Sequence, residues 1–362
     1  MNISAFIAAA VMSAAAFVSA PSEPVQAAAA PEVSAKGCVV IDALSGDVLY
    51  AKNEKMRLPM ASTTKIMSAY IALGGEDLDV PFTVDSEAIK VEGSSMGLRE
   101  GDTVTMRALA AGMLLPSGND AANAAAVRIA GSVDAFVGLM NGYAAELGLR
   151  DTHFVTPSGL DDYTDDHYST ALDMARLTRT ALENKEFREL CGMKSAQVEF
   201  GDPPYKRWLT NTNKLLTSCE GVFGVKTGFT DKARRCLVSA CRRDGAELIC
   251  VTLNDPDDWA DHSKLYDYCF GLMQKVSLSP ELSGYKIALA GGEKKELRCC
   301  GESSQISLPA SAIGRLERVT LIKPFLYAPV AAGEEVGETR FYLDGRLIGR
   351  LPITASEEAP AA

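Results

Sequence analysis

Three short motifs in this sequence carry side chains that suit acyl transfer. In chain order they are Ser62-x-x-Lys65, Ser117-x-Asn119 and Lys226-Thr227-Gly228. A serine hydroxyl becomes a strong nucleophile when a neighbouring base removes its proton, and a neutral lysine amine is such a base. N–H groups must then stabilise the oxyanion that forms. The motifs therefore supply a nucleophile, a base and substrate-binding groups.

The surroundings of Ser62 distinguish the first motif from a chance match. A Ser-x-x-Lys pattern arises by chance roughly once or twice in a chain of this length, and the pattern at Ser283, in a strand-and-turn stretch, is such a case. Ser62, in contrast, follows Pro59 and precedes the helix-compatible residues 66–73. It is therefore predicted to begin a helix, with Lys65 on the same face about one turn away. The amides of a first helical turn also favour negative charge on a bound carbonyl oxygen.

Lys65 can act as a base only when its amine is neutral. Its pKa must therefore be lowered, by burial and by a second cation, for which Lys226 is the candidate. Ser117 and Asn119 are expected on a loop that meets the Ser62 helix. There the Ser117 hydroxyl can relay a proton toward the leaving amine, while the Asn119 amide holds the substrate backbone.

The Lys-Thr-Gly motif lies in a strand-like stretch. We expect an edge strand that pairs with an extended peptide, with Gly228 permitting its close approach. Thr227 together with Lys226 can hold a carboxylate, and the backbone N–H groups of Ser62 and Phe229 can form the oxyanion hole. Taken alone, the second and third motifs have simpler explanations, as a helix-capping turn and as a strand that ends at a glycine. Their joint occurrence with the Ser62 helix favours the catalytic interpretation.

The surrounding elements predict an α+β domain over residues 28–275. They are, in chain order, a two-stranded hairpin at 38–51, helices from 62 to about 190, strands between 222 and 254, and an amphipathic helix at 261–275. Strands at both ends of such a region, with helices between them, predict one antiparallel sheet flanked by helices.

A second domain follows the first. After Val276, short alternating runs are separated by glycine, proline and charged turns, which is typical of a small all-β sandwich, here predicted over 276–355. Residues 356–362 are predicted to be a disordered tail. The sequence ends with no amphipathic or spanning helix, so we expect no clear membrane anchor there.

Composition excludes some classes of function. The 362 residues are 47% hydrophobic, ample for a large core and a second domain. The net charge is −11 and the charges are interspersed without a basic run, which argues against nucleic-acid binding and against a polybasic membrane patch.

The only long apolar run lies at residues 5–20 and is rich in alanine. Small residues that suit cleavage follow it, so residues 1–27 are predicted to be a signal peptide and the protein to be extracytoplasmic. Residues 1–6 carry no lysine or arginine, a departure from the usual leader. An uncleaved membrane anchor is the alternative, which the shortness of the run disfavours.

Nine cysteines and three histidines offer no obvious metal or disulfide framework. The cysteines show no Cys-x-x-Cys spacing, and most stand within apolar segments, which favours buried free thiols. His153, His167 and His262 have no paired ligand spacing, so neither a metal nor a cofactor is expected.

In this order the three motifs resemble the signature of the penicillin-interacting serine acyltransferases, which include penicillin-binding proteins and class A β-lactamases. Among these, the chain resembles the serine-type D-alanyl-D-alanine carboxypeptidases of the peptidase S11 type, which are low-molecular-mass penicillin-binding proteins. The family-like stretches extend over nearly the whole mature chain and include residues 40–42, 116–122, 156–160 and 167–173.

The resemblance implies a β-lactamase/transpeptidase-like fold for the first domain and the family's second domain for the β module. It implies an enzyme that removes the terminal D-alanine from peptidoglycan stem pentapeptides. Ser62 would be the acylated nucleophile and Lys65 the base, Ser117 and Asn119 the second motif, and Lys226 with Thr227 the carboxylate-binding motif. β-Lactam antibiotics would acylate Ser62 as covalent inhibitors.

The sequence departs from the family pattern in three places. Arg234 and Arg235 stand where relatives usually place a glycine. Residues 255–259, Asp-Pro-Asp-Asp-Trp, stand where relatives often carry an arginine that helps to hold the terminal carboxylate. The family's frequent C-terminal membrane-binding helix is missing. The carboxylate-binding groups beyond Thr227 therefore stay open at this point.

Three alternatives remain. A class A β-lactamase needs a glutamate that activates the deacylating water and carries Ser-Asp-Asn as its second motif, whereas this chain has Ser-Gly-Asn and no glutamate between Gly159 and Thr180. A DD-endopeptidase or transpeptidase on the same scaffold is not distinguished by the motifs. A non-catalytic penicillin-binding wall protein would not need Lys65 or Ser117.

Overall fold

A computed structural model of the chain describes residues 10–14, 29–280, 282 and 284–362. The chain divides into two compact units. One comprises Ala27–Gly271, and the other comprises Leu272–Ala362 together with Met1–Gln26. Each unit is described by itself.

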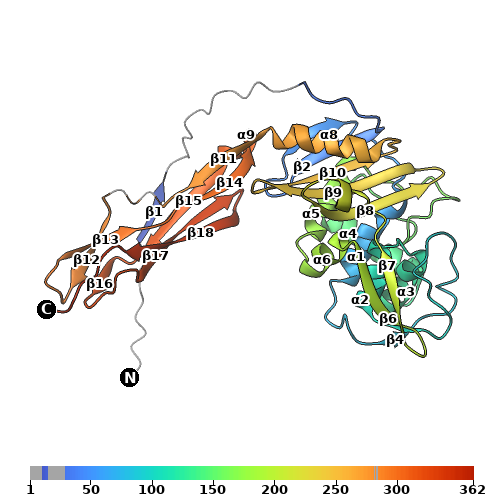
Figure 1. Cartoon of the computed structure of the whole chain (residues 1–362), viewed down its shortest axis with the longest axis horizontal. Helices are drawn as coiled ribbons and strands as arrows, with labels where there is room; N and C mark the ends of the chain where they lie inside the picture. The colour runs from blue at the N-terminus through green and yellow to red at the C-terminus, as the bar shows by residue number, and fades with distance from the viewer. Residues whose placement is uncertain (1–9, 15–28, 281, 283) are drawn as a thin grey trace. The chain divides into compact units, whose positions relative to one another are not determined.

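A five-stranded antiparallel sheet forms the centre of the first unit. Its strands, in spatial order, are β3 (Val48–Lys52), β2 (Gly37–Asp42), β10 (Ala246–Leu253), β9 (Arg234–Arg243) and β8 (Val222–Thr230). Strands β2, β9 and β10 are buried along most of their length because helices cover both faces of the sheet. Figure 1 shows α8 (Asp258–Phe270) on one face and the other helices on the opposite face. The predicted antiparallel sheet flanked by helices is confirmed.

The remaining helices pack into one core beneath this sheet. They are α1 (Lys65–Ala72), α2 (Met106–Leu114), α3 (Asn119–Ala130), α4 (Val133–Glu146), α5 (Ala171–Ala181), α6 (Lys185–Gly192) and the short α7 (Leu215–Ser218). Side chains of Thr105, Ser132, Thr170 and Asn184 cap the N-termini of α2, α4, α5 and α6. The alanines of α3 are nearly all buried, which allows α2, α3 and α4 to approach closely. Two small two-stranded antiparallel sheets, β4 (Phe82–Thr83) with β5 (Thr103–Val104) and β6 (Ser195–Phe200) with β7 (Tyr205–Thr210), complete the unit.

The closing helix differs from its predicted span of 261–275. Helix α8 begins at Asp258, where Asp258 and Asp261 place negative charge in the first turn, beside the positive end of the helix dipole. It ends at Phe270 because Gly271 follows it and the next residues enter strand β11 (Met273–Leu278).

The second unit is rich in β-structure, as predicted. Strand β11 pairs with β14 (Ser304–Pro309), and α9 (Ala310–Ile313) follows. A seven-stranded sheet contains, in spatial order, β1 (Ala10–Ala14), β15 (Leu316–Ile322), β17 (Glu335–Leu343), β18 (Arg346–Ala355), β13 (Glu296–Cys300), β12 (Lys286–Ala290) and β16 (Phe325–Tyr327). Buried residues such as Leu297, Val336 and Ile353 give this unit a core of its own.

Two predictions concerned the ends of the chain, a signal peptide at the N-terminus and a disordered tail at the C-terminus. Most of the predicted signal peptide, residues 1–27, lies outside the described residues, and Ala10–Ala14 pairs antiparallel with β15. The predicted disorder of residues 356–362 is wrong at Ala359, which is buried and exchanges two backbone hydrogen bonds with Val330. Among the described residues, no helix is long and apolar enough to cross a membrane.

Candidate active site

Ser62 lies on a single 3₁₀ turn, η1 (Ala61–Thr64), that leads directly into α1. The α-helix itself therefore begins at Lys65, three residues later than predicted. Lys65 still lies one turn from Ser62, and its Nζ is 2.9 Å from the Ser62 Oγ. The hydroxyl and the amine are thus in direct hydrogen-bond contact.

Lys65 occupies a site that favours its neutral form. The side chain is fully buried, and its Nζ contacts the Asn119 Oδ1 and the Ser158 carbonyl oxygen, each at 2.7 Å. Burial lowers the pKa of Lys65 well below its ordinary value, and the positive charge of Lys226 lowers it further, against the opposing effect of Asp120. A neutral amine donates two hydrogen bonds and keeps a lone pair for the proton of Ser62.

Lys226 joins Ser117 to this centre. Its Nζ donates to the Ser117 Oγ at 2.9 Å and to the Thr227 carbonyl oxygen at 2.8 Å. Burial lowers the pKa of Lys226 to about 7. Ser117 has a φ of 67°, a left-handed conformation that few residues with a Cβ adopt. The Ser117 hydroxyl therefore lies between a buried amine and the space in front of Ser62.

Asp120 fixes the loop in front of the second motif. Its carboxylate accepts hydrogen bonds from the Ser95 hydroxyl and from the backbone N–H groups of Met96, Gly97 and Leu98. The Asn119 amide donates to the Glu92 carbonyl oxygen at 2.7 Å. The start of α3 is thus tied to the segment 92–98, which positions Asn119 against Lys65.

The Lys-Thr-Gly motif lies on β8, the last strand of the sheet and hence an edge. A Cβ at Gly228 would lie 3.1 Å from the Ser62 backbone nitrogen and 3.1 Å from the Met60 carbonyl oxygen. Glycine at this position therefore lets β8 pass close to the turn that carries Ser62, because a Cβ there would force its neighbours to move. The next residue, Phe229, has a side chain that is 60% exposed.

These elements enclose a cleft of about 400 Å³. It is lined by Ser62, Ser94, Ser117, Thr212, Lys214, Thr227, Gly228, Phe229, Arg235, Asp258 and Trp259. Five of the eight residues predicted from the motifs line the cleft itself. The other three, Lys65, Asn119 and Lys226, lie buried directly behind Ser62 and Ser117. The structure therefore places all eight in one region.

Comparison with known proteins identifies the family of this site. The sequence profile of the D-alanyl-D-alanine carboxypeptidases, peptidase S11, matches residues 24–257. This chain belongs to the D-alanyl-D-alanine carboxypeptidase family. Residues 286–361 match the C-terminal domain of penicillin-binding protein 5.

Relatives of this carboxypeptidase cover most of the chain. It is 34% identical over 350 residues to the D-alanyl-D-alanine carboxypeptidase DacC of Escherichia coli, covering 92% of this chain and 86% of that protein. Its identity to DacF of Bacillus subtilis is 30% over 339 residues, covering 91% and 86%. The crystal structure of DacD from Francisella tularensis matches 95% of this chain and 98% of its own, with a TM-score of 0.65 and 26% identity. The penicillin-binding proteins of this family are extracytoplasmic.

Arg235 is a cleft residue of the carboxypeptidase that the sequence analysis named without placing. It lies on β9 opposite Phe229, and its Nη2 forms an ion pair with Asp258, which is almost fully buried. Its guanidinium carbon stands 5.3 Å from the centroid of the Trp259 ring. Two residues at the start of α8 thus hold Arg235 at the cleft, and the adjacent Arg234 is exposed.

Lys226 and Thr227 have different places in the carboxypeptidase site. The Lys226 amine is buried and bound to Ser117, so it does not line the cleft as a free carboxylate ligand. The Thr227 hydroxyl lies 2.6 Å from that of Thr212, and both line the cleft together with Arg235. No pattern in the sequence marked Thr212, because its nearness to Thr227 depends on the packing of distant segments.

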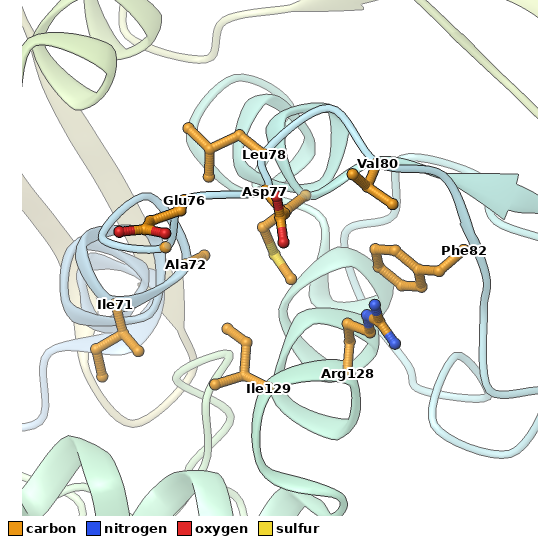
Figure 2. Close-up of a pocket in the computed structure, with 11 residues that line it drawn as sticks. Ile71, Ala72, Glu76, Asp77, Leu78, Val80, Phe82, Arg128 and Ile129 are labelled. Carbon is orange, nitrogen blue, oxygen red and sulfur yellow. The ribbon is translucent and has the colours of Figure 1, made fainter.

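A second hollow of about 480 Å³ lies apart from these groups (Figure 2). It is formed by the end of α1, the segment before β4 and the end of α3, with Arg128 over the ring of Phe82 and with Glu76 and Asp77 nearby. It holds no serine or lysine. Residues of the three predicted motifs thus line the cleft that contains Ser62, and none of them lines this second hollow.

Proposed function

We propose that Ser62 is the nucleophile with which this carboxypeptidase removes the terminal D-alanine of peptidoglycan stem pentapeptides. The observation that carries the proposal is the 2.9 Å contact between the Ser62 Oγ and the Nζ of fully buried Lys65. The neutral amine takes the hydroxyl proton while the Oγ attacks the carbonyl carbon of the penultimate D-alanine. The backbone N–H groups of Ser62 and Phe229 stabilise the resulting oxyanion.

The Ser117 hydroxyl serves the leaving group. Collapse of the tetrahedral intermediate breaks the peptide bond, and the departing nitrogen needs a proton. The Ser117 Oγ lies in the cleft and accepts a hydrogen bond from the Lys226 Nζ. It can therefore pass its proton to the departing nitrogen of D-alanine and receive another from Lys226. D-alanine leaves at this step and the Ser62 ester remains. Water then attacks the ester, one of its protons returns to the Ser62 Oγ, and the shortened peptide leaves as the free acid.

Arg235 is proposed to hold the terminal carboxylate with Thr227 and Thr212. A guanidinium and two hydroxyls at one end of a cleft match the geometry and charge of a carboxylate. The family's arginine ahead of the closing helix is replaced here by a guanidinium from the neighbouring strand, which Asp258 and Trp259 orient.

Arg235→Gln is expected to lower kcat/KM for a peptide ending in D-Ala-D-Ala about 10- to 100-fold, mainly through KM, because one charge-assisted hydrogen bond contributes about 1.5–3 kcal/mol. A peptide whose C-terminus is amidated lacks the carboxylate and should lose less than about threefold. Arg234→Gln is the matched control and should behave like the wild type. Equal losses for the acid and the amide would show that Arg235 does not bind the carboxylate.

The pH dependence of acylation is expected to report the coupled pair Lys65 and Lys226. Acylation needs neutral Lys65, so its rate should rise with pH through a limb that lies well below the ordinary lysine value of 10.5. Lys226→Gln removes a positive charge that depresses the pKa of Lys65, so the limb should move to higher pH. The measurement is the second-order acylation constant of a chromogenic β-lactam between about pH 5 and 10. A limb that stays in place in Lys226→Gln would contradict this coupling.

One assay tests the proposed function directly. The purified mature chain is incubated with a fluorescent penicillin and, separately, with a pentapeptide ending in D-Ala-D-Ala and with a cross-linked dimer. Durable labelling at Ser62 with release of D-alanine from the pentapeptide supports the carboxypeptidase. Cleavage of the dimer alone would favour an endopeptidase, rapid antibiotic turnover without D-alanine release a β-lactamase, and absence of any label a non-catalytic wall protein.

We also propose the processing and the domain boundaries of the chain. Residues 1–27 form a signal peptide removed on export, residues 28–275 the catalytic domain and residues 276–355 the β-domain. The family's extracytoplasmic location supports export. The mass of the mature N-terminus isolated from the exported protein tests the cleavage position.

A further inference from the structure

Ala61, whose carbonyl group forms the peptide bond to Ser62, is held in an unusual backbone conformation. Ala61 has a φ of 48°, a left-handed value that residues with a Cβ rarely adopt. A Cβ at Gly159 would lie 2.0 Å from the Ala61 carbonyl oxygen, and a Cβ at Gly228 would lie 3.1 Å from the Ala61 Cβ. The Gly159 loop and strand β8 thus enclose this peptide from two sides.

Two side-chain hydrogen bonds in series end at the same peptide. The Thr64 hydroxyl donates to the Ala61 carbonyl oxygen at 2.7 Å, and the His167 Nε2 lies 2.8 Å from the Thr64 Oγ1. The backbone N–H of Val155 donates to the His167 Nδ1 at 2.9 Å. Since Nδ1 accepts a hydrogen bond and is therefore unprotonated, and since the Thr64 hydroxyl donates its proton to Ala61, Nε2 must donate to the Thr64 Oγ1. The direction of the series is therefore fixed, from His167 through Thr64 to Ala61.

The His167 ring stays neutral, with its proton on Nε2, over the pH range in which the enzyme works. His167 is buried, and burial is the main cause that lowers its pKa to about 3. The neutral tautomer with a proton on Nε2 is thus present at every pH at which Lys65 is a base.

We propose that Thr64 and His167 are positioning residues for the oxyanion hole: they orient and polarise the Ala61–Ser62 peptide, whose N–H stabilises the oxyanion. An amide whose oxygen accepts a hydrogen bond is a stronger N–H donor, because hydrogen bonds in series polarise one another. A donor aimed at the developing oxyanion raises the rate of acylation without tightening substrate binding. The inference rests on the proposed function, since this N–H acts only when Ser62 is the nucleophile.

Thr64→Val removes the hydroxyl at nearly constant volume. It is expected to lower the rate constant of acylation by a fluorescent penicillin about 10- to 100-fold, with the non-covalent dissociation constant unchanged. Thr64→Ser retains the hydroxyl and should recover acylation to within about twofold. His167→Asn keeps an acceptor for Val155 but loses the donor to Thr64, so an intermediate loss is expected.

Thr63→Val is the matched control. Thr63 is equally buried in the same turn, and its hydroxyl donates to the Met60 carbonyl oxygen at 2.6 Å. This variant should lose comparable thermal stability but less than about threefold in acylation rate, because its hydrogen bond does not end on the oxyanion peptide. Equal losses in Thr63→Val and Thr64→Val, or no recovery in Thr64→Ser, would overturn the proposal.

A boronic acid analogue of the D-Ala-D-Ala end gives an independent measurement. Its anionic oxygen occupies the oxyanion hole, so Thr64→Val should weaken its binding by the same factor as acylation. If Thr64→Val does not fold, the acylation rate constant of His167→Asn tests the proposal instead. An unchanged rate constant in that variant would overturn it. Failure of the proposed function is distinct, because the wild type would then show no label at Ser62.

Discussion

Ser62→Ala is expected to leave a folded protein that neither releases D-alanine nor forms a covalent adduct with penicillin. The Ser62 Oγ is the cleft hydroxyl in direct contact with Lys65. Loss of the nucleophile of a serine enzyme reduces turnover by at least about 10⁴-fold, because the remaining groups bind substrate without a route to the acyl-enzyme. The measurements are D-alanine release and intact-protein mass after incubation with penicillin.

Ser283→Ala is the control for this variant. Ser283 stands in the chance match to the same motif, three residues before Lys286, so its loss should leave both signals unchanged. Circular dichroism should show Ser62→Ala folded like the wild type, since the hydroxyl is only partly buried. A penicillin adduct that persists in Ser62→Ala would assign the nucleophile to another residue, for which Ser117 would be the first candidate.

Local geometry accounts for the proposed catalytic groups only within each motif. The contacts between motifs, such as that of Lys65 with Asn119 and that of Lys226 with Ser117, span 54 and 109 positions and were predicted from the resemblance to the family signature. Ser62 and Lys65 meet within one helical turn, and the strand that carries Lys226, Thr227 and Gly228 fixes their spacing by its own repeat. The lowered pKa of Lys65 was expected from the same reasoning, and the structure adds that burial is its larger cause, ahead of Lys226.

Contacts between distant segments could not be predicted in this way. Arg235 reaches the cleft because β9 runs beside β8 and because α8 begins with Asp258 and Trp259 next to it. His167 contacts Thr64 across 103 positions of the chain. Neither a motif nor a hydrophobic period specifies which side chains meet across such a distance. The sequence therefore did not predict that Arg235 lies at the cleft or that His167 contacts Thr64.

A second kind of wrong prediction concerned the last residues of the chain. Composition suggested that residues 356–362 are disordered because alanine, proline and glutamate dominate them. The structure pairs Ala359 with Val330 through two backbone hydrogen bonds. Backbone pairing of this kind depends on the partner strand and not on the side chains, which is why a short polar segment can be ordered against its composition.

Lys65→Met is expected to abolish acylation while the protein stays folded. The variant replaces a buried amine by an apolar side chain of similar length, and loss of a general base lowers the rate by about 10²- to 10⁴-fold. Lys65→Arg keeps a positive charge and hydrogen-bond donors but cannot accept a proton at working pH, so it should lose as much. Substantial acylation by Lys65→Arg would show that the charge of Lys65, and not its basicity, is what catalysis requires.

The stability of Lys65→Met provides a second readout with a defined sign. The folded pKa of Lys65 lies well below the unfolded one, so folding releases a proton at pH values between the two, and the wild type is destabilised at every pH below the unfolded value near 10.4. This penalty shrinks as the pH rises toward that value. The free energy of unfolding of Lys65→Met relative to the wild type should therefore fall steadily between about pH 7 and 10 in denaturant titrations. Lys90→Met, which removes the same charge from an exposed side chain, should show no such trend, and a flat difference for Lys65→Met would mean that Lys65 is charged in the folded enzyme and cannot be its base.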